Sequence, residues 1–303
     1  MDENLPIITV EEPHIRSKRS AAKRCAVVIS ALAATLIALC AVAFVVGKDT
    51  FLSGWLNKKA AVEEAPREAG IYDFDAAKVP SGCTGIIPVD LSGKSEKIEA
   101  IAPSVTAGKV IVIATHPYEA YTGEVTAYAD DDFSATGGEY TTAKVAEFLA
   151  SELRRLGVDA EYVDVGVSSG RESYALAAEK IKNYDGGDVF CVIDVHRAAL
   201  VDEKGNILRP IAQSGDDITA QVALVAAKGC AKYETRLSNA AALAEKMNEK
   251  CERSALVASR DGVLNQDADA VFFTAEIGAV GNSCAEAIRA ATVLAAGLRE
   301  LME

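Results

Sequence analysis

The sequence predicts a single α/β domain with a mainly parallel central sheet flanked by helices, preceded by one transmembrane helix. Short apolar runs alternate with amphipathic helical stripes through the second two thirds of the 303 residues, and half of all residues are hydrophobic while only 6% are aromatic. An uncharged apolar run near the N-terminus predicts the membrane helix. The length suits one large domain with accessory segments.

The apolar run covers residues 25–47 and contains 23 residues without a charge. At about 1.5 Å per residue it crosses a hydrocarbon core of about 30 Å. A cleaved signal peptide has an apolar core of only about 7–15 residues. Five basic residues lie between positions 16 and 24, and positive residues stay on the cytoplasmic side. We expect a single-pass type II protein of the cell membrane.

This topology divides the chain into four parts. We expect a cytoplasmic basic tail at 1–24, the transmembrane helix at 25–47, a stalk or linker at 48–105 and an extracytoplasmic domain at 106–303. The net charge of −13 repels phosphate backbones, so nucleic acid is excluded as a partner. The seven cysteines show no C-x-x-C spacing, and we expect no disulfide framework.

The domain begins with a β-α-β pattern. Residues 110–114 form a short apolar run typical of a buried parallel strand, and it ends in Thr115-His116-Pro117. Residues 141–156 carry a helical apolar stripe that Gly157 closes, and residues 161–165 indicate another strand.

The pattern repeats further along the chain. A helix at 171–182 precedes a strand at 189–195, which ends in His196. The remaining expected elements are a hairpin pair at 207–213 and 219–227, a helix at 238–251, a buried strand at 271–277 and a helix at 283–301. Ser283 and Glu286 have the spacing of a capping box.

Two of the three histidines, His116 and His196, lie in the outer domain, and each follows an apolar strand. His116 and Glu119 have an H-x-x-E spacing, which lets an imidazole and a carboxylate reach one cation. A catalytic zinc site takes three protein ligands and leaves one position for water, so these three residues predict a zinc site. Ligands of open α/β sheets bind beyond the carboxyl ends of the strands, where these residues meet if the strands are neighbours.

Glu276 lies in an otherwise apolar strand, and burying a lone carboxylate is costly. We interpret it as the general base that takes a proton from the attacking water. The alternative is an ordinary ion pair with a nearby Arg or Lys.

Other residues are weaker candidates. Asp194 shares a strand face with His196 and is placed to orient that ligand, or to serve as a cap. Arg197 is placed to hold a substrate carboxylate, or is a solvated charge. Three further residues either line the cleft as substrate-binding residues or pack the loops: Tyr121, Asn265 and Gln266.

These motifs resemble the stage II sporulation protein P family over roughly residues 108–303. The matching segments are Thr115-His116-x-x-Glu119-x-Tyr121, Ser173-Tyr174, residues 192–197, residues 265–267 and residues 276–278. The resemblance implies the fold shared by amidases and zinc carboxypeptidases. It also implies His116, Glu119 and His196 as Zn²⁺ ligands and Glu276 as the catalytic glutamate.

The resemblance implies a zinc-dependent N-acetylmuramoyl-L-alanine amidase with an added endopeptidase action on peptide cross-links. Its substrate would be septal peptidoglycan during engulfment of the forespore, and its partners the sporulation stage II proteins D and M. The chain departs from the family at Pro117 and Tyr118, and at Ala198, where the family has an aspartate. We expect Ala198 to remove an acidic group from the edge of the cleft.

Two alternatives remain open. A zinc carboxypeptidase presents the same residues in the same order, but it also needs an Arg and Asn clamp for the substrate carboxylate, and none stands out between the ligands. A catalytically impaired scaffold that binds the cell wall is the other alternative, and Ala198 is its main support.

Overall fold

The computed structural model describes residues 71–74, 87–89, 108–122, 139–166, 171–184, 189–202, 206–214 and 217–303. All of them fall within the second of two units into which the chain divides, Gly70–Glu303. The predicted tail at 1–24 and membrane helix at 25–47 lie outside the described residues. Within the described ranges, no helix has the length and hydrophobicity needed to cross a bilayer.

A seven-stranded sheet forms the centre of the domain, in the order β2-β9-β8-β10-β5-β3-β4. Its strands are β2 (Ile87–Pro88), β3 (Lys109–Ile113), β4 (Ala160–Tyr162), β5 (Val189–Ala198), β8 (Val222–Ala227), β9 (Ala255–Arg260) and β10 (Val271–Ala279). Between these described strands, β2 with β9 and β8 with β10 pair antiparallel, and the other pairs are parallel. The prediction of a mainly parallel sheet is confirmed.

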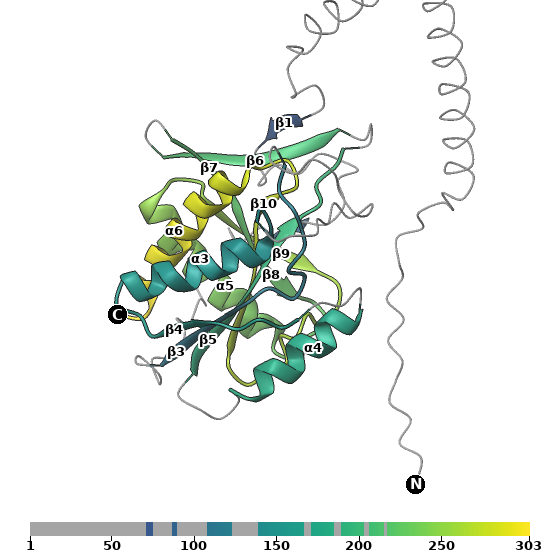
Figure 1. Ribbon diagram of the computed structural model, residues 1–303, viewed down its shortest axis with the longest axis vertical. Helices are drawn as coiled ribbons and strands as arrows, with labels where there is room; N and C mark the ends of the chain where they lie inside the picture. The colour runs from purple at the N-terminus through teal and green to yellow at the C-terminus, as the bar shows by residue number, and fades with distance from the viewer. Residues whose placement is uncertain are drawn as a thin grey trace, which may run out of the picture. The chain divides into compact units, whose positions relative to one another are not determined.

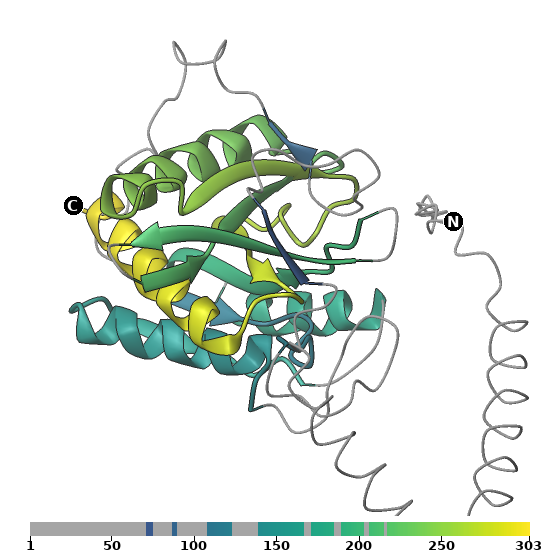
Figure 2. The same cartoon turned by 90° about the horizontal axis from the view of Figure 1, so that it is seen from above.

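Helices cover both faces of this sheet unequally. Helices α3 (Thr142–Arg155), α5 (Tyr233–Lys250) and α6 (Cys284–Leu301) pack side by side on one face, as Figure 2 shows. Helix α4 (Arg171–Lys182) lies on the other face, apart from them (Figure 1). Along β3 the alternation is direct, since Val110 and Val112 join the three-helix core while Ile111 and Ile113 pack with residues of α4.

A second sheet corrects one prediction. Strands β1 (Ile71–Phe74), β6 (Ile207–Ser214) and β7 (Asp217–Ala220) form it, with β1 parallel to β6 and β7 antiparallel to it. The hairpin partner of β6 is therefore only the segment 217–220, because the fully apolar strand β8 continues into the buried main sheet. Strands β1 and β2, one in each sheet, lie inside the segment 48–105, whose prediction as a stalk or linker stays a prediction.

Most helix boundaries follow the local signals in the sequence. Gly157 ends α3 with a φ of 84°, and the amide of Val158 donates to the carbonyl of Leu153. The capping box of Ser283 and Glu286 begins α6 as predicted. Helix α5 begins at Tyr233, five residues before the predicted start at 238. Strand β9 was not predicted, because its six residues include alanines and serine, which are weak strand formers.

Candidate active site

Three neighbouring strands, β3, β5 and β10, end at the same edge of the main sheet. The Cα atom of Glu276 on β10 pairs with that of His196 on β5, and Asp194 pairs with Thr274 two positions earlier. Alternation places these side chains on the face that carries only α4, since Val192 and Phe272 pack with α4. The structure thus brings together residues that are 80 positions apart in the chain.

His116 and Glu119 lie in the turn that follows β3. The amide of Glu119 donates to the carbonyl of His116 over 3.2 Å. The first residue of α3, Thr142, fixes both ends of this turn: its hydroxyl donates to His116 O at 2.6 Å and its amide to Glu119 O at 2.9 Å. The H-x-x-E turn is therefore attached to the rigid start of α3.

The two imidazoles face one another across the site. The ring centroids of His116 and His196 are 5.3 Å apart, and Nδ1 of His196 lies 3.6 Å from Oε2 of Glu119. The ring of Tyr174, in the first turn of α4, covers the pair, with centroids 5.1 Å from His116 and 6.3 Å from His196. Tyr174 belongs to a segment that resembles the family, but it was not among the predicted site residues.

Asp194 is fully buried beside His196, as an orienting residue needs to be. Its carboxylate accepts the amide of Thr115 at 2.9 Å and the hydroxyl of Thr115 at 2.7 Å. Its Oδ2 lies 3.1 Å from Nε2 of His196, although the two are not aligned as a hydrogen bond. Burial lowers the pKa of His196, but the Asp194 and Glu119 carboxylates and Tyr174 together outweigh burial and raise that pKa well above its usual value. The site therefore stabilises positive charge.

The other two predicted ligands, Glu119 and His116, have the protonation states that bind a metal ion, whereas a metal on His196 would have to displace its proton. Burial disfavours the charged form of Glu119, but His196 and Arg197 outweigh it and lower the pKa of this carboxyl. The backbone amide of Arg197 donates to Oε2 of Glu119 at 3.1 Å. Burial, helped by the charge of His196, lowers the pKa of His116. An ionised glutamate and a neutral imidazole are the forms that bind metal.

Glu276 pairs with an arginine that the sequence analysis missed. Its side chain is only 3% exposed, and Oε1 accepts a hydrogen bond from Nη1 of Arg260 at 3.0 Å. Its Oε2 is buried and has no hydrogen-bond partner among the described residues. Burial raises the pKa of Glu276, while the Arg260 guanidinium opposes that change. Glu276 therefore forms the ion pair that was its alternative prediction, and it also lies beside His196, where a general base is expected.

Two predicted substrate-binding residues are instead buried supports of the fold. Tyr121 is fully buried, and its hydroxyl donates to the carbonyl of Ile277 at 2.9 Å. Gln266 is fully buried as well: Oε1 accepts the amide of Ala227, while Nε2 donates to Val225 O and to the hydroxyl of Thr274. Their polar groups hold loops onto the sheet, so they do not line a cleft.

Two more predicted substrate-binding residues, Arg197 and Asn265, donate to backbone carbonyls. Arg197 is 3% exposed and its Nε donates to Ala120 O at 2.9 Å, because alternation directs it away from His196. Asn265 is partly exposed and donates to the backbone carbonyl of Tyr174 at 3.0 Å, so its contact with substrate stays a prediction. Ala198 is buried in an apolar cluster with Leu200 and Leu208, not at an exposed edge.

The donor set and its pairwise separations fit a zinc ion. Two ligand atoms on one tetrahedral zinc lie about 3.4 Å apart, and two imidazoles that share it have centroids about 5 Å apart. The pairs His196 with Glu119 and His116 with His196 match these values at 3.6 Å and 5.3 Å. In the described part of the chain, however, no three His, Cys, Asp or Glu side chains are already gathered tightly enough to hold a metal.

An α/β fold with titratable residues at the carboxyl edge of its parallel strands defines a protein with an enzyme-like site. Residues 78–299 match the family model described as stage II sporulation protein P. The chain therefore belongs to the stage II sporulation protein P family. No curated protein matches the chain.

Three solved structures are among those similar to the chain. An N-acetylmuramoyl-L-alanine amidase from Clostridium difficile 630 is 13% identical with a TM-score of 0.38, over 65% of this chain and 95% of that one. The amidase AmiC2 of Nostoc punctiforme is 12% identical with a TM-score of 0.36, over 65% and 98%. The CwlD amidase from Clostridioides difficile, solved in complex with the GerS lipoprotein, is 13% identical with a TM-score of 0.38, over 64% and 98%.

Proposed function

We propose that this protein is a membrane-anchored zinc hydrolase that cuts the amide between N-acetylmuramic acid and L-alanine in peptidoglycan. We extend the proposal to peptide cross-links and to remodelling of the septal wall during sporulation. Membership of the stage II sporulation protein P family supports it. The observation that carries it is the gathering of four residues from three neighbouring strand ends: His116, Glu119, His196 and Glu276.

His116, Glu119 and His196 are the residues that would hold the zinc. A bound zinc ion polarises the scissile carbonyl and lowers the pKa of water. Asp194 lies on the Nε2 side of His196, which leaves Nδ1, on the side of Glu119, as the nitrogen for the metal. A carboxylate behind a ligating histidine fixes the ring and strengthens it as a ligand.

Glu276 moves the proton in this proposal. Its Oε2 takes a proton from the water as the water oxygen bonds to the amide carbon. The same atom then returns the proton to the amide nitrogen as the carbon–nitrogen bond breaks. Oε2 suits this role because it is buried and has no hydrogen bond within the described ranges, while Oε1 is fixed by Arg260.

The location is also proposed from the sequence. The apolar run at 25–47 and the basic residues before it support a single-pass type II anchor with the domain outside the cytoplasm. Peptidoglycan lies on that side of the membrane. We propose sporulation stage II proteins D and M as partners, because they are the partners that the family resemblance implies.

A zinc carboxypeptidase is the second candidate, and Arg260 is the observation that favours it. Its side chain is 42% exposed beside Glu276, where a guanidinium suits a substrate carboxylate. The scaffold alternative rests on Ala198, which is packed with Leu200 and Leu208 in an apolar cluster.

Hydrolysis of two substrates separates these functions. The full chain, purified in detergent, is incubated with intact peptidoglycan sacculi and, separately, with free peptides that end in a carboxylate. Release of whole stem peptides from the glycan supports the amidase, and loss of C-terminal residues from free peptides supports the carboxypeptidase. If the protein binds about one zinc ion per chain but catalyses neither reaction, both candidate functions are contradicted. Glu276→Gln serves as the inactive control.

A further inference from the structure

Arg260 reaches the site from a strand that does not adjoin β10. It is the last residue of β9, and β8 lies between β9 and β10. The Cα partner of Arg260 on β8 is Ala227, and that of Glu276 is Ala223. The side chain of Arg260 spans β8, and its Nη1 donates to Oε1 of Glu276 at 3.0 Å.

One contact leaves most of this guanidinium unused. An arginine has several N–H donors in a planar fork, and among the described residues only Nη1 of Arg260 makes a hydrogen bond, the one to Glu276. The side chain of Arg260 is 42% exposed, whereas that of Glu276 is 3% exposed. The side chain of Arg260 is therefore partly accessible from solvent beside Glu276, and its remaining donors are unused by the described residues.

The groups around Arg260 keep it positively charged. Glu276, Tyr174 and Glu119 together raise the pKa of Arg260 against the effect of burial. A fixed positive charge at this position attracts an oxygen that becomes negative during a reaction.

We propose that Arg260 is a catalytic residue, which fixes Oε1 of Glu276 with one nitrogen and donates from the others to the carbonyl oxygen of the scissile amide. This inference rests on the proposed function. As the water oxygen bonds to the carbon, the π electron pair of the carbonyl moves to its oxygen, which Arg260 stabilises. The pair returns when the carbon–nitrogen bond breaks and the nitrogen takes the proton from Glu276.

A purely structural ion pair is the competing explanation. It accounts for the contact with Glu276 but uses none of the exposed donors. The two explanations differ in kinetics, because donors aimed at the transition state change kcat, while a group that binds a substrate carboxylate changes KM.

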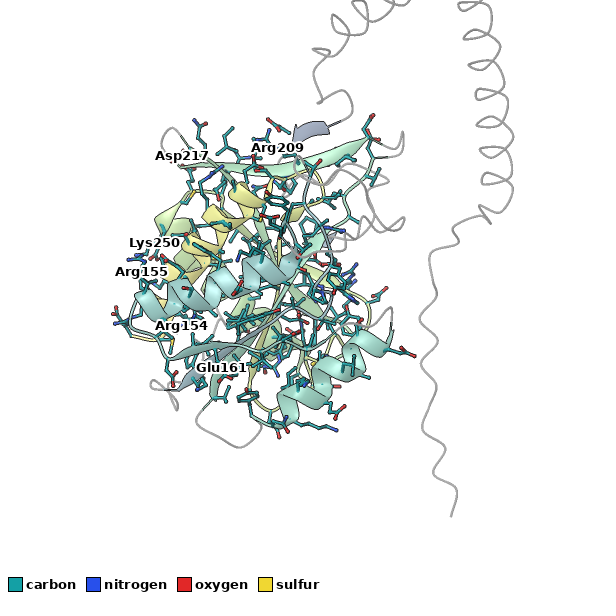
Figure 3. The ribbon with its side chains drawn as sticks, in the orientation of Figure 1. Arg154, Arg155, Glu161, Arg209, Asp217 and Lys250 are labelled. Atoms are coloured by element: carbon teal, nitrogen blue, oxygen red, sulfur yellow. The ribbon has the colours of Figure 1, made fainter. Side chains whose placement is uncertain are left out.

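The test uses the full chain in detergent with Arg260→Gln, Arg260→Lys and the control Arg155→Gln. Arg155 also pairs with a glutamate, Glu152, but it lies at the end of α3, where Figure 3 labels it. For Arg260→Gln we expect kcat for release of stem peptides to fall about 100-fold, with KM changed less than about threefold. Arg260→Lys keeps the charge but not the fork, and we expect a fall of about tenfold. Arg155→Gln should match the native chain.

Rescue by a small molecule separates a chemical role from a structural one. We expect guanidinium chloride at low millimolar concentration to restore part of the kcat of Arg260→Gln and to leave the native chain unchanged. If Arg260→Gln does not fold, the same comparison is made with Arg260→Lys. In that case, a kcat of Arg260→Lys within about threefold of the native value overturns the proposal.

Two other results also overturn it: a native kcat in folded Arg260→Gln, or a raised KM with unchanged kcat, which indicates a carboxylate clamp. A native chain that binds zinc but releases no stem peptides rejects the proposed function instead. The two failures are therefore distinguishable.

Discussion

The Cα atoms of Glu276 and His196 are partners in the parallel ladder between β10 and β5. A carboxylate and an imidazole thus enter the site from adjacent strands, at a spacing that the hydrogen bonds of the sheet determine. After this pair β10 is irregular, and Ala279 pairs with Ala198. The proton-accepting group and the predicted metal ligand are therefore positioned by the central sheet of the domain.

Replacing Glu276 by glutamine should abolish most hydrolysis without loss of zinc. The amide keeps the size of the carboxyl but takes no proton from water, and general base catalysis contributes about 10²–10⁴ in rate. We expect kcat for stem-peptide release to fall by about 10³, measured by chromatography of the released peptides. Zinc content, measured by atomic emission on the same sample, should remain at the native level.

Glu161→Gln is the matched control, because Glu161, which Figure 3 labels on the edge strand β4, accepts hydrogen bonds from Lys109 and Tyr184. Its activity should be native. Turnover of Glu276→Gln at the native rate would remove Glu276 from the role of base.

Asp194→Asn should weaken zinc binding. The native carboxylate accepts both donors of Thr115 and lies against Nε2 of His196, and losing such a contact behind a ligand lowers metal affinity by about 10–100-fold. Competition with a fluorescent chelator measures the Kd. Asp267→Asn, which replaces an acceptor for the amide of Ala231, provides the same chemical change elsewhere and should keep the native Kd. Equal affinities in both variants would contradict an orienting role.

The strand ends could be predicted from the sequence because a buried strand has a recognisable apolar pattern. A polar residue after a run of apolar β-branched residues is visible without a structure, and this is how His116, His196 and Glu276 were found. Their convergence needed only that β3, β5 and β10 be neighbours, which the order of the sheet confirms.

Arg260 could not be found in this way, because its contact with Glu276 depends on the order of β9, β8 and β10 in the sheet. Gln266 and Tyr121 were wrongly predicted to bind substrate, for the opposite reason. They lie close in sequence to site residues, but their polar groups bond to the backbone inside the core. A buried polar residue near a motif is as often a support for a loop as a group that contacts a ligand.

Gly278→Ala should destabilise the domain and disturb the site. Gly278 has a φ of 70°, and a Cβ there would lie 2.7 Å from Oδ1 of Asn282 and 2.9 Å from Cβ of Ala220. The strained backbone and the clash together should cost about 2–3 kcal/mol. Urea unfolding, monitored by far-UV circular dichroism, measures the loss in the free energy of unfolding.

Gly157→Ala tests the backbone term alone, since its φ is 84° but a Cβ would meet no atom within 4 Å. Its loss should be smaller, about 1 kcal/mol. An equal loss in both variants would mean that the contacts of Gly278 with Asn282 and Ala220 do not matter.

The stability of the domain should depend on pH through Glu286, at the start of α6. Burial alone would raise the pKa of Glu286, but hydrogen bonds from Arg209 and Asn282 outweigh it and lower that pKa below its usual 4.5. Since the folded pKa lies below the unfolded one, this carboxylate adds stability that is complete above the unfolded pKa. The added stability is lost as the pH falls through the folded pKa.

Arg209→Met removes the main cause of that shift. Arg209 lies on β6, where Figure 3 labels it, and joins Glu286 to Asp73 of β1. At pH 7 the variant should lose about 2 kcal/mol of unfolding free energy, because Glu286 stays buried without its partner. Between about pH 5 and 3 its stability should fall less steeply than that of the native chain, since the folded pKa of Glu286 is no longer lowered by Arg209.

Lys144→Met, which breaks the exposed pair with Glu147, should change the free energy of unfolding by less than about 0.5 kcal/mol and keep the native pH dependence. Parallel acid slopes for Arg209→Met and the native chain would show that the Arg209–Glu286 pair does not set the acid stability of this domain.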